Sequence, residues 1–205
     1  MIKTLTLLLA IPFFLGASLI PYKSYTTISA VTNSSVTLSD ALPLPNMSAL
    51  VIRNLNNTQY AIAYIKPTRS NSARIIDTDP LNGGHLANIK PIVAVGDKVE
   101  AGFLYDKYML LAPNKKAYES ITSSFGLTPI DSELFLAYLK AKHKTTPNTA
   151  DYKEFAKLLG IGLFIIAKNN TLELYDPISK AVIKKVAFNF DNSIEIKPFY
   201  TNLAQ

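Results

Sequence analysis

The chain of 205 residues contains no cysteine. This absence excludes disulfide bonds, thiol nucleophiles and cysteine-ligated metals, so the stability of the fold must come from packing. Histidine is almost as scarce, because His85 and His143 are the only two and lie far apart in the sequence. No set of residues recurs at the spacing of a zinc site. We therefore expect neither a metal nor a cofactor.

Sequence signatures of catalysis are also missing. No G-x-S-x-G nucleophile elbow occurs, and the one glycine-rich loop, Asn82 to His85, lacks the lysine and Ser/Thr of a phosphate-binding loop. Asp77 and Asp79 are close together but precede Pro80, in a segment that we expect to be a solvent-exposed loop. We therefore predict that the protein is not an enzyme. No catalytic, cofactor-binding or metal residue is assigned, and the sequence does not identify the binding residues.

Positive charge is in modest excess, with a net charge of +6 and a pI near 9.3. The excess is spread thinly: residues 19–112 carry eight Lys or Arg against six Asp or Glu, and residues 113–205 carry twelve against nine. The densest run, from Lys140 to Lys144, suits a helix C-terminus, where cations complement the helix dipole. We therefore predict no nucleic-acid partner.

The N-terminus has the pattern of an export signal. Met1 to Lys3 is a charged start, and an apolar run from Leu5 to Leu15 leads to small residues that end at Ser18. The run is too short to span a bilayer comfortably. We predict a signal peptide over residues 1–18, cleavage after Ser18, no stable membrane span afterwards and a periplasmic location. An uncleaved anchor and a cell-surface location are the alternatives.

The first half of the chain, residues 19–112, has the composition of β-strands. It contains short β-branched runs separated by turn residues, and Asn56 with Asn57 forms a hairpin signal. Such closely spaced strands predict a small β-barrel or sandwich. The expected strands are Tyr25 to Val31, Ala49 to Asn54, Gln59 to Lys66, Ala73 to Asp77 and Lys98 to Ala112, with Pro43, Pro45, Pro67, Pro80 and Pro91 between them.

The second half, residues 113–205, predicts three helices and then a return to strands. The helix signals are a start at Asn114 with a stop at Gly126, a capping-box-like start from Thr128 to Asp131, and a cap at Asn148 or Thr149 with a stop at Gly160. Residues 161–167 are almost wholly apolar, as in a strand buried on both faces, and a hairpin at Asn169 and Asn170 follows.

These patterns predict an α+β fold of two tightly apposed subdomains. The first is the barrel or sandwich, and in the second three helices pack on an antiparallel or mixed sheet. The first strand of that sheet is expected within residues 105–111, and a further strand within residues 181–188.

One stretch of the chain resembles a known family. Residues from about Ile92 to Tyr200 are similar to the N-terminal domain of the plasminogen-binding protein A family of Helicobacter-type bacteria. The residues that carry the resemblance are Gly96, Asp97, Val99, Leu110 to Asn114, Tyr118, Ile121, Ser132, Leu134, Leu139, the hairpin between Gly162 and Leu172, Pro198 and Phe199. None of these motifs is catalytic.

The resemblance implies export and a link to plasminogen. In that family, plasminogen capture is ascribed to a terminal lysine on a charged extension, whereas the sequence here ends at Gln205. We therefore expect weak plasminogen binding. Internal lysines beside acids could imitate a terminal lysine, and Lys153 with Glu154 is one such place, although solvated helix surface is the simpler interpretation.

Three functional hypotheses follow. The first is a non-enzymatic interaction or scaffold module that binds envelope or periplasmic proteins, among them proteins of the polar flagellar motor. The second is a surface-exposed adhesin that captures host plasminogen. The third is an envelope enzyme of unknown chemistry, which we rank last because the sequence offers no nucleophile, base or metal cluster.

Overall fold

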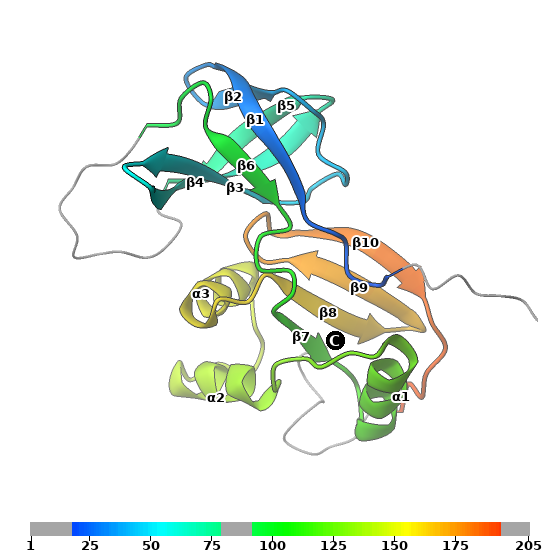
Figure 1. Ribbon diagram of the computed structural model, residues 1–205. Coiled ribbons are helices and arrows are strands. Elements are labelled where there is room, and N and C mark those ends of the chain that lie inside the picture. The colour runs from blue at the N-terminus through cyan, green and yellow to red at the C-terminus, as the bar shows by residue number, and fades with distance from the viewer. Residues whose placement is uncertain (1–17, 79–91, 194–205) are drawn as a thin grey trace, which may run out of the picture.

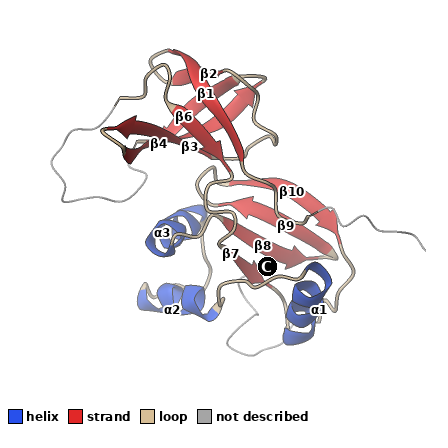
Figure 2. Ribbon diagram, in the orientation of Figure 1, coloured by secondary structure: helices blue, strands red, loops and turns tan. Residues whose placement is uncertain are grey.

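The computed structural model describes residues 18–78 and 92–193. The expected signal peptide up to residue 17, the glycine-rich loop with His85, and Pro198 with Phe199 lie outside the described residues. Figure 1 and Figure 2 show a β-barrel beside a second unit, in which helices surround a sheet. The predicted α+β fold is therefore confirmed.

The first subdomain is a closed barrel with strand order β1-β2-β5-β4-β3-β6. All its strand pairs are antiparallel, and pairing of β1 with β6 closes the barrel, so no open sheet edge remains. Its strands are β1 (Ser24–Val31), β2 (Ser35–Leu38), β3 (Ala49–Leu55), β4 (Thr58–Arg69), β5 (Ser72–Asp77) and β6 (Lys98–Ala101).

Asparagines form the predicted hairpin between β3 and β4. Asn56 and Asn57 have φ of 49° and 62°, the left-handed geometry that a two-residue hairpin turn requires. The prediction that Pro67 separates strands was wrong. It lies inside β4, where the register shifts between Pro67 and Arg69, and such a shift accommodates a residue that lacks an amide donor.

The expected single strand Lys98 to Ala112 is two strands in different sheets. β6 ends at Ala101, and β7 (Tyr108–Leu111) belongs to the second sheet. Between them the chain turns at Gly102 and Leu104, whose φ values are 73° and 61°. The change of sheet therefore occurs within this turn.

The second sheet has the order β10-β9-β8-β7. Its other strands are β8 (Leu163–Lys168), β9 (Thr171–Asp176) and β10 (Ala181–Ala187). β7 and β8 are parallel and the other pairs are antiparallel, so the sheet is mixed. β8 is buried on both faces as predicted, because Leu163 and Ile165 enter one apolar cluster while Phe164 enters another.

The three helices are α1 (Lys115–Phe125), α2 (Glu133–Ala141) and α3 (Thr149–Leu159). Asn114 caps α1 and Gly126 ends it, as predicted. The predicted start of α2 was wrong: its N-cap is Ser132, and Ile130 instead forms a bridge with Met109 of β7. Pairing with the sheet edge thus overrode the capping pattern of the preceding residues.

A capping box starts α3. The Asn148 side chain accepts hydrogen bonds from the Ala150 and Asp151 amides, and Asp151 accepts one from the Asn148 amide. Burial opposes ionisation of Asp151, but hydrogen bonds from Lys144 and the Asn148 backbone outweigh it and hold the pKa of this carboxyl below its ordinary value. The cap is therefore in its charged form at neutral pH.

The helices divide between the two faces of the second sheet. α1 contributes Ala117 and Ile121 to a cluster that also contains barrel residues and one face of the sheet. On the other face, Phe135 of α2 and Phe155 of α3 pack together, with ring centroids 4.8 Å apart. The barrel and the second subdomain thus share one continuous core.

A buried carboxylate fixes the junction of the subdomains. Asp176, fully buried at the end of β9, accepts hydrogen bonds through Oδ2 from the Ser48 amide at 2.6 Å and the Tyr105 hydroxyl at 2.7 Å. Its Oδ1 accepts from the amides of Ile178 and Ser179 at 2.8 and 2.9 Å. Burial and the nearby Asp176 charge raise the pKa of Tyr105, which keeps it protonated as a donor.

Candidate functional site

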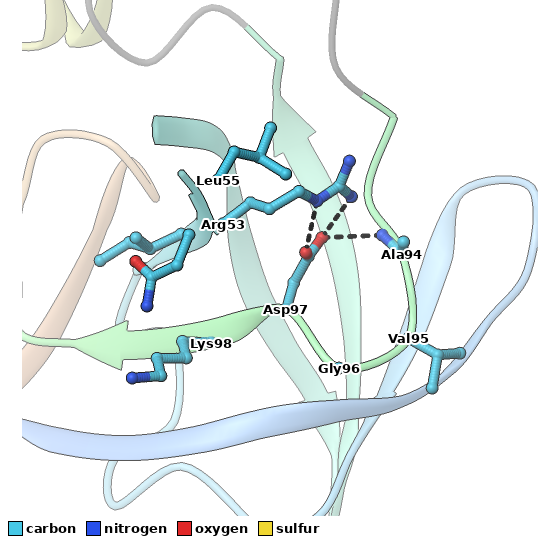
Figure 3. Close-up of a pocket in the computed structure, with 9 residues that line it drawn as sticks. Arg53, Leu55, Ala94, Val95, Gly96, Asp97 and Lys98 are labelled. Carbon is cyan, nitrogen blue, oxygen red and sulfur yellow. Dashed lines mark hydrogen bonds and ion pairs between the residues drawn. The ribbon is translucent and has the colours of Figure 1, made fainter. Parts of the chain in front are cut away.

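An ion pair lies at the hairpin end of the barrel. Arg53 of β3 donates from Nε to Oδ1 of Asp97 at 2.7 Å and from Nη2 to Oδ2 at 2.8 Å. The same Nη2 donates to the Ile92 carbonyl at 2.6 Å, and the Ala94 amide donates to Asp97 Oδ2 at 2.8 Å. Figure 3 shows this arrangement, with Arg53 reaching across to the carboxylate.

Local backbone geometry positions Asp97. Gly96, with φ of 88°, donates from its amide to the Ile28 carbonyl at 2.9 Å, and the Asp97 amide donates to the Ala94 carbonyl at 3.2 Å. The turn therefore directs the carboxylate inward. The Asp97 side chain is only 4% exposed and Arg53 25%, so the pair is shielded from solvent more than an ordinary surface salt bridge.

Several apolar side chains near this ion pair are exposed to solvent. Leu55 is 52% exposed, Tyr60 48%, Ile92 81% and Val95 65%. Tyr60 is the register partner of Arg53 across the hairpin, which places the two side chains on one face. Together with exposed Lys98, we call these the barrel-end patch: Arg53, Leu55, Tyr60, Ile92, Val95 and Lys98.

A hollow of about 320 Å³ lies within this region, and its wall includes Leu55, Val95 and Lys98. Its charged lining consists of Arg53, Asp97 and Lys98, of which the first two neutralise each other. The hydrogen bond to Asp97 raises the pKa of Arg53, so the guanidinium cannot act as a proton donor. The arrangement suits docking of an apolar or Tyr-rich protein surface better than acid–base chemistry.

Gly96 and Asp97 are among the residues that carry the family resemblance, which assigned them no role. The structure shows that they lie at a turn before β6 and that the Asp97 carboxylate holds Arg53. Arg53 lies 44 residues earlier in the chain, so no local spacing signals the pair. The only sequence signal was the acidic residue immediately before the strand.

The expected exposure of Asp77 was wrong. Asp77 is the last residue of β5, and its side chain is only 10% exposed. Its Oδ2 forms ion pairs with two lysines of α3, at 2.6 Å from Lys153 Nζ and 2.8 Å from Lys157 Nζ. Lys153 is therefore tied to the barrel and is not a solvated partner of Glu154. Glu154 instead binds Lys142 and Tyr138.

Among the residues that the structure describes, no group of three or more His, Cys, Asp or Glu side chains could hold a metal ion. His143 is exposed just after α2. In the described ranges, no helix is both long enough and apolar enough to cross a membrane.

Comparison with known proteins supports the resemblance seen in the sequence. The family model described as "Plasminogen-binding protein pgbA N-terminal" matches residues 23–205, which is most of the chain and includes the whole barrel. No curated protein and no solved structure matches the chain.

Proposed function

Because this chain belongs to the plasminogen-binding protein pgbA N-terminal family, we propose that it is an exported, non-catalytic interaction module of the cell envelope. Its partner is another envelope or periplasmic protein, and the proteins of a polar flagellar motor are among the candidates. Residues 1–18 support export through their charged start, apolar run and small residues before the expected cleavage point.

The barrel-end patch is the single observation that carries this proposal. It combines tyrosine and arginine, the residue types enriched at protein-binding hot spots, with three exposed aliphatic side chains. An apolar cluster that remains in solvent on a folded domain marks an interaction surface. The ion pair with Asp97 fixes the side chain of Arg53, which reduces the entropy that this residue loses on binding.

The state of the buried acids supports a non-catalytic role. Asp77, Asp97 and Asp151 each lie in an ion pair with lysine or arginine, and Asp176 is saturated by four hydrogen bonds. Carboxylates held in this way serve as structural anchors and are poorly placed to exchange protons with a substrate.

Site-specific crosslinking in cells tests the proposal. A photo-reactive amino acid at Leu55 should give a discrete adduct in the envelope fraction, and the same group at Leu134 is the matched control. Leu134 lies on α2 with 49% exposure, close to that of Leu55. A Tyr60→Ala substitution should weaken the Leu55 adduct. Equal crosslinking at the two positions, or an adduct that Tyr60→Ala leaves unchanged, would contradict docking at the patch.

Plasminogen capture at the cell surface is the second candidate, and the family description favours it. Kringle domains that recognise lysine need an accessible ammonium beside a carboxylate. The internal pair considered for this role is not presented, because Lys153 binds Asp77. We expect weak binding of plasminogen to the purified protein. Tight binding that a lysine analogue abolishes would favour the adhesin over the envelope module.

A further inference from the structure

A second hollow, separate from the barrel-end patch, lies where the barrel meets the second subdomain. Its volume is about 430 Å³, within the range of small-molecule sites. Three parts of the chain form it: strands β4 and β5, helix α3, and the turn between β9 and β10. We call it the junction cleft. Its charged lining residues are Lys66, Arg74, Lys153 and Lys180.

The charges of the junction cleft are unbalanced. No acidic side chain is among its lining residues, and the nearby Asp77 is already engaged by Lys153 and Lys157. Within residues 18–78 and 92–193, no carboxylate lies within ion-pair distance of Lys66, Arg74 or Lys180. Three cations thus line one concave surface without a counter-charge from the described protein.

The sheet register places two of these cations directly opposite each other. Lys66 of β4 is the register partner of Arg74 of β5, so both side chains leave the same face of the barrel wall. Like charges at directly opposed positions destabilise an antiparallel pair. Two opposed cations that lower the stability of the free protein are typical of a binding site, where an anionic ligand supplies the missing negative charge.

The turn between β9 and β10 adds rigid polar groups. Asp176 holds this turn through the amides of Ile178 and Ser179, and Lys66 Nζ donates to the Ser179 carbonyl at 3.3 Å. Ser179 is 8% exposed, and its buried hydroxyl has no hydrogen-bond partner among the described residues. The turn therefore contributes a carbonyl that binds Lys66, and beneath the surface it holds a hydroxyl without a hydrogen-bond partner among the described residues, which is uncommon in a folded protein.

We propose that the junction cleft binds a small, multiply charged oxyanion, a phosphate or carboxylate compound. Lys66 and Arg74 bind it from the barrel and Lys180 binds it from the turn, while Lys153 of α3, which is paired with Asp77, also lines the cleft. The planar guanidinium of Arg74 suits a bidentate contact with either oxyanion. Because the site joins both subdomains, a bound anion also stabilises their contact. This assignment does not depend on the barrel-end patch.

Titration of the purified protein at low ionic strength tests the assignment, with pyrophosphate and citrate as separate probes. Isothermal titration calorimetry should detect one site, and the melting temperature should rise with anion concentration. Binding of pyrophosphate alone identifies a phosphate site, citrate alone a carboxylate site, and binding of both a general oxyanion site. Absence of binding by both probes overturns the proposal.

Substitutions distinguish anion binding in the cleft from a nonspecific effect of the net charge of the protein. Lys66→Met and Arg74→Met should each weaken anion binding by about tenfold or more, since each removes a charge-assisted contact. Lys140→Met, at an exposed lysine of α2, removes the same charge elsewhere and should change binding less than twofold. Equal losses in all three variants overturn the site.

A second measurement compares the melting temperature without and with the anion. Without anion, Arg74→Met should melt at a higher temperature than the parent, because it relieves the repulsion with Lys66. With anion, the order should reverse. If Arg74→Met destabilises the protein to the same extent in both conditions, Arg74 has a structural role only and the proposal fails.

Discussion

Replacing Tyr105 by phenylalanine tests whether one hydroxyl secures the junction of the two subdomains. The ring is kept, and the hydrogen bond from the hydroxyl to Asp176 Oδ2 at 2.7 Å is lost. Tyr105 is 1% exposed and Asp176 fully buried, so water cannot replace the bond. The carboxylate still accepts from the Ser48 amide, so one bond to a charged acceptor is removed. We expect the free energy of unfolding to fall by about 1.5–3 kcal/mol.

Thermal melting is a suitable assay for a change of this size. For a chain of about 200 residues, 1 kcal/mol corresponds to about 2–4 °C, so the melting temperature should fall by about 3–12 °C. Urea unfolding should show a lower midpoint with an unchanged slope. Tyr22→Phe is the control, because Tyr22 is 78% exposed and should change stability by less than about 0.5 kcal/mol. If the Tyr105 variant melts like this control, the Asp176 bond contributes nothing.

The remaining predictions concern the second subdomain. Leu163→Asp should unfold it, since an unpaired carboxylate would be buried in the central strand, and protease sensitivity with loss of cooperative melting would show this. Gly162→Ala should destabilise the protein severely, because the added Cβ would lie 2.3 Å from the Leu104 backbone. Gly126→Ala is the control: its Cβ would meet no atom within 4 Å, so the substitution should cost only about 1–2 kcal/mol for the positive φ. Similar melting of the two alanine variants would refute this. Because the pKa of Asp151 is lowered in the folded state, its carboxylate stabilises the fold at neutral pH and loses this effect on acidification. Asp151→Asn should therefore reduce the free energy of unfolding more at about pH 7 than at about pH 3. An equal reduction at the two pH values would contradict the assigned charge.

Local sequence signals predicted the parts of the fold that depend on neighbouring residues. The paired asparagines at both hairpins, the Asn114 cap and the terminal glycines of α1 and α3 are where the sequence placed them. Signals failed where a distant partner decided the outcome. β2 was not predicted, because a four-residue strand in a Ser/Thr-rich segment is too short to show a clear alternation of apolar and polar residues. Its pairing with β1 and β5 makes it a strand.

The ion pair at the barrel-end patch and the ion pairs of Asp77 beside the junction cleft could not be assembled from the sequence for the same reason. Asp97 meets Arg53 only because β3 and β6 are adjacent in the barrel. Asp77 appeared to lie in an exposed loop, yet α3 covers it with two lysines. In both cases the burial of a carboxylate depends on tertiary placement, and neither composition nor spacing along the chain contains that information.

Strand β4 also separates the two sites in space, which makes their proposed functions independently testable. Tyr60 of the barrel-end patch lies near its start and Lys66 of the junction cleft near its end. Six residues of strand at about 3.3 Å each separate them by about 20 Å, which is roughly two and a half times the screening length at physiological ionic strength. Removing a charge at the cleft should therefore leave crosslinking at Leu55 unchanged, and Tyr60→Ala should leave anion affinity unchanged. If either substitution alters both measurements, the barrel couples the two sites, and anion binding then regulates docking of the partner.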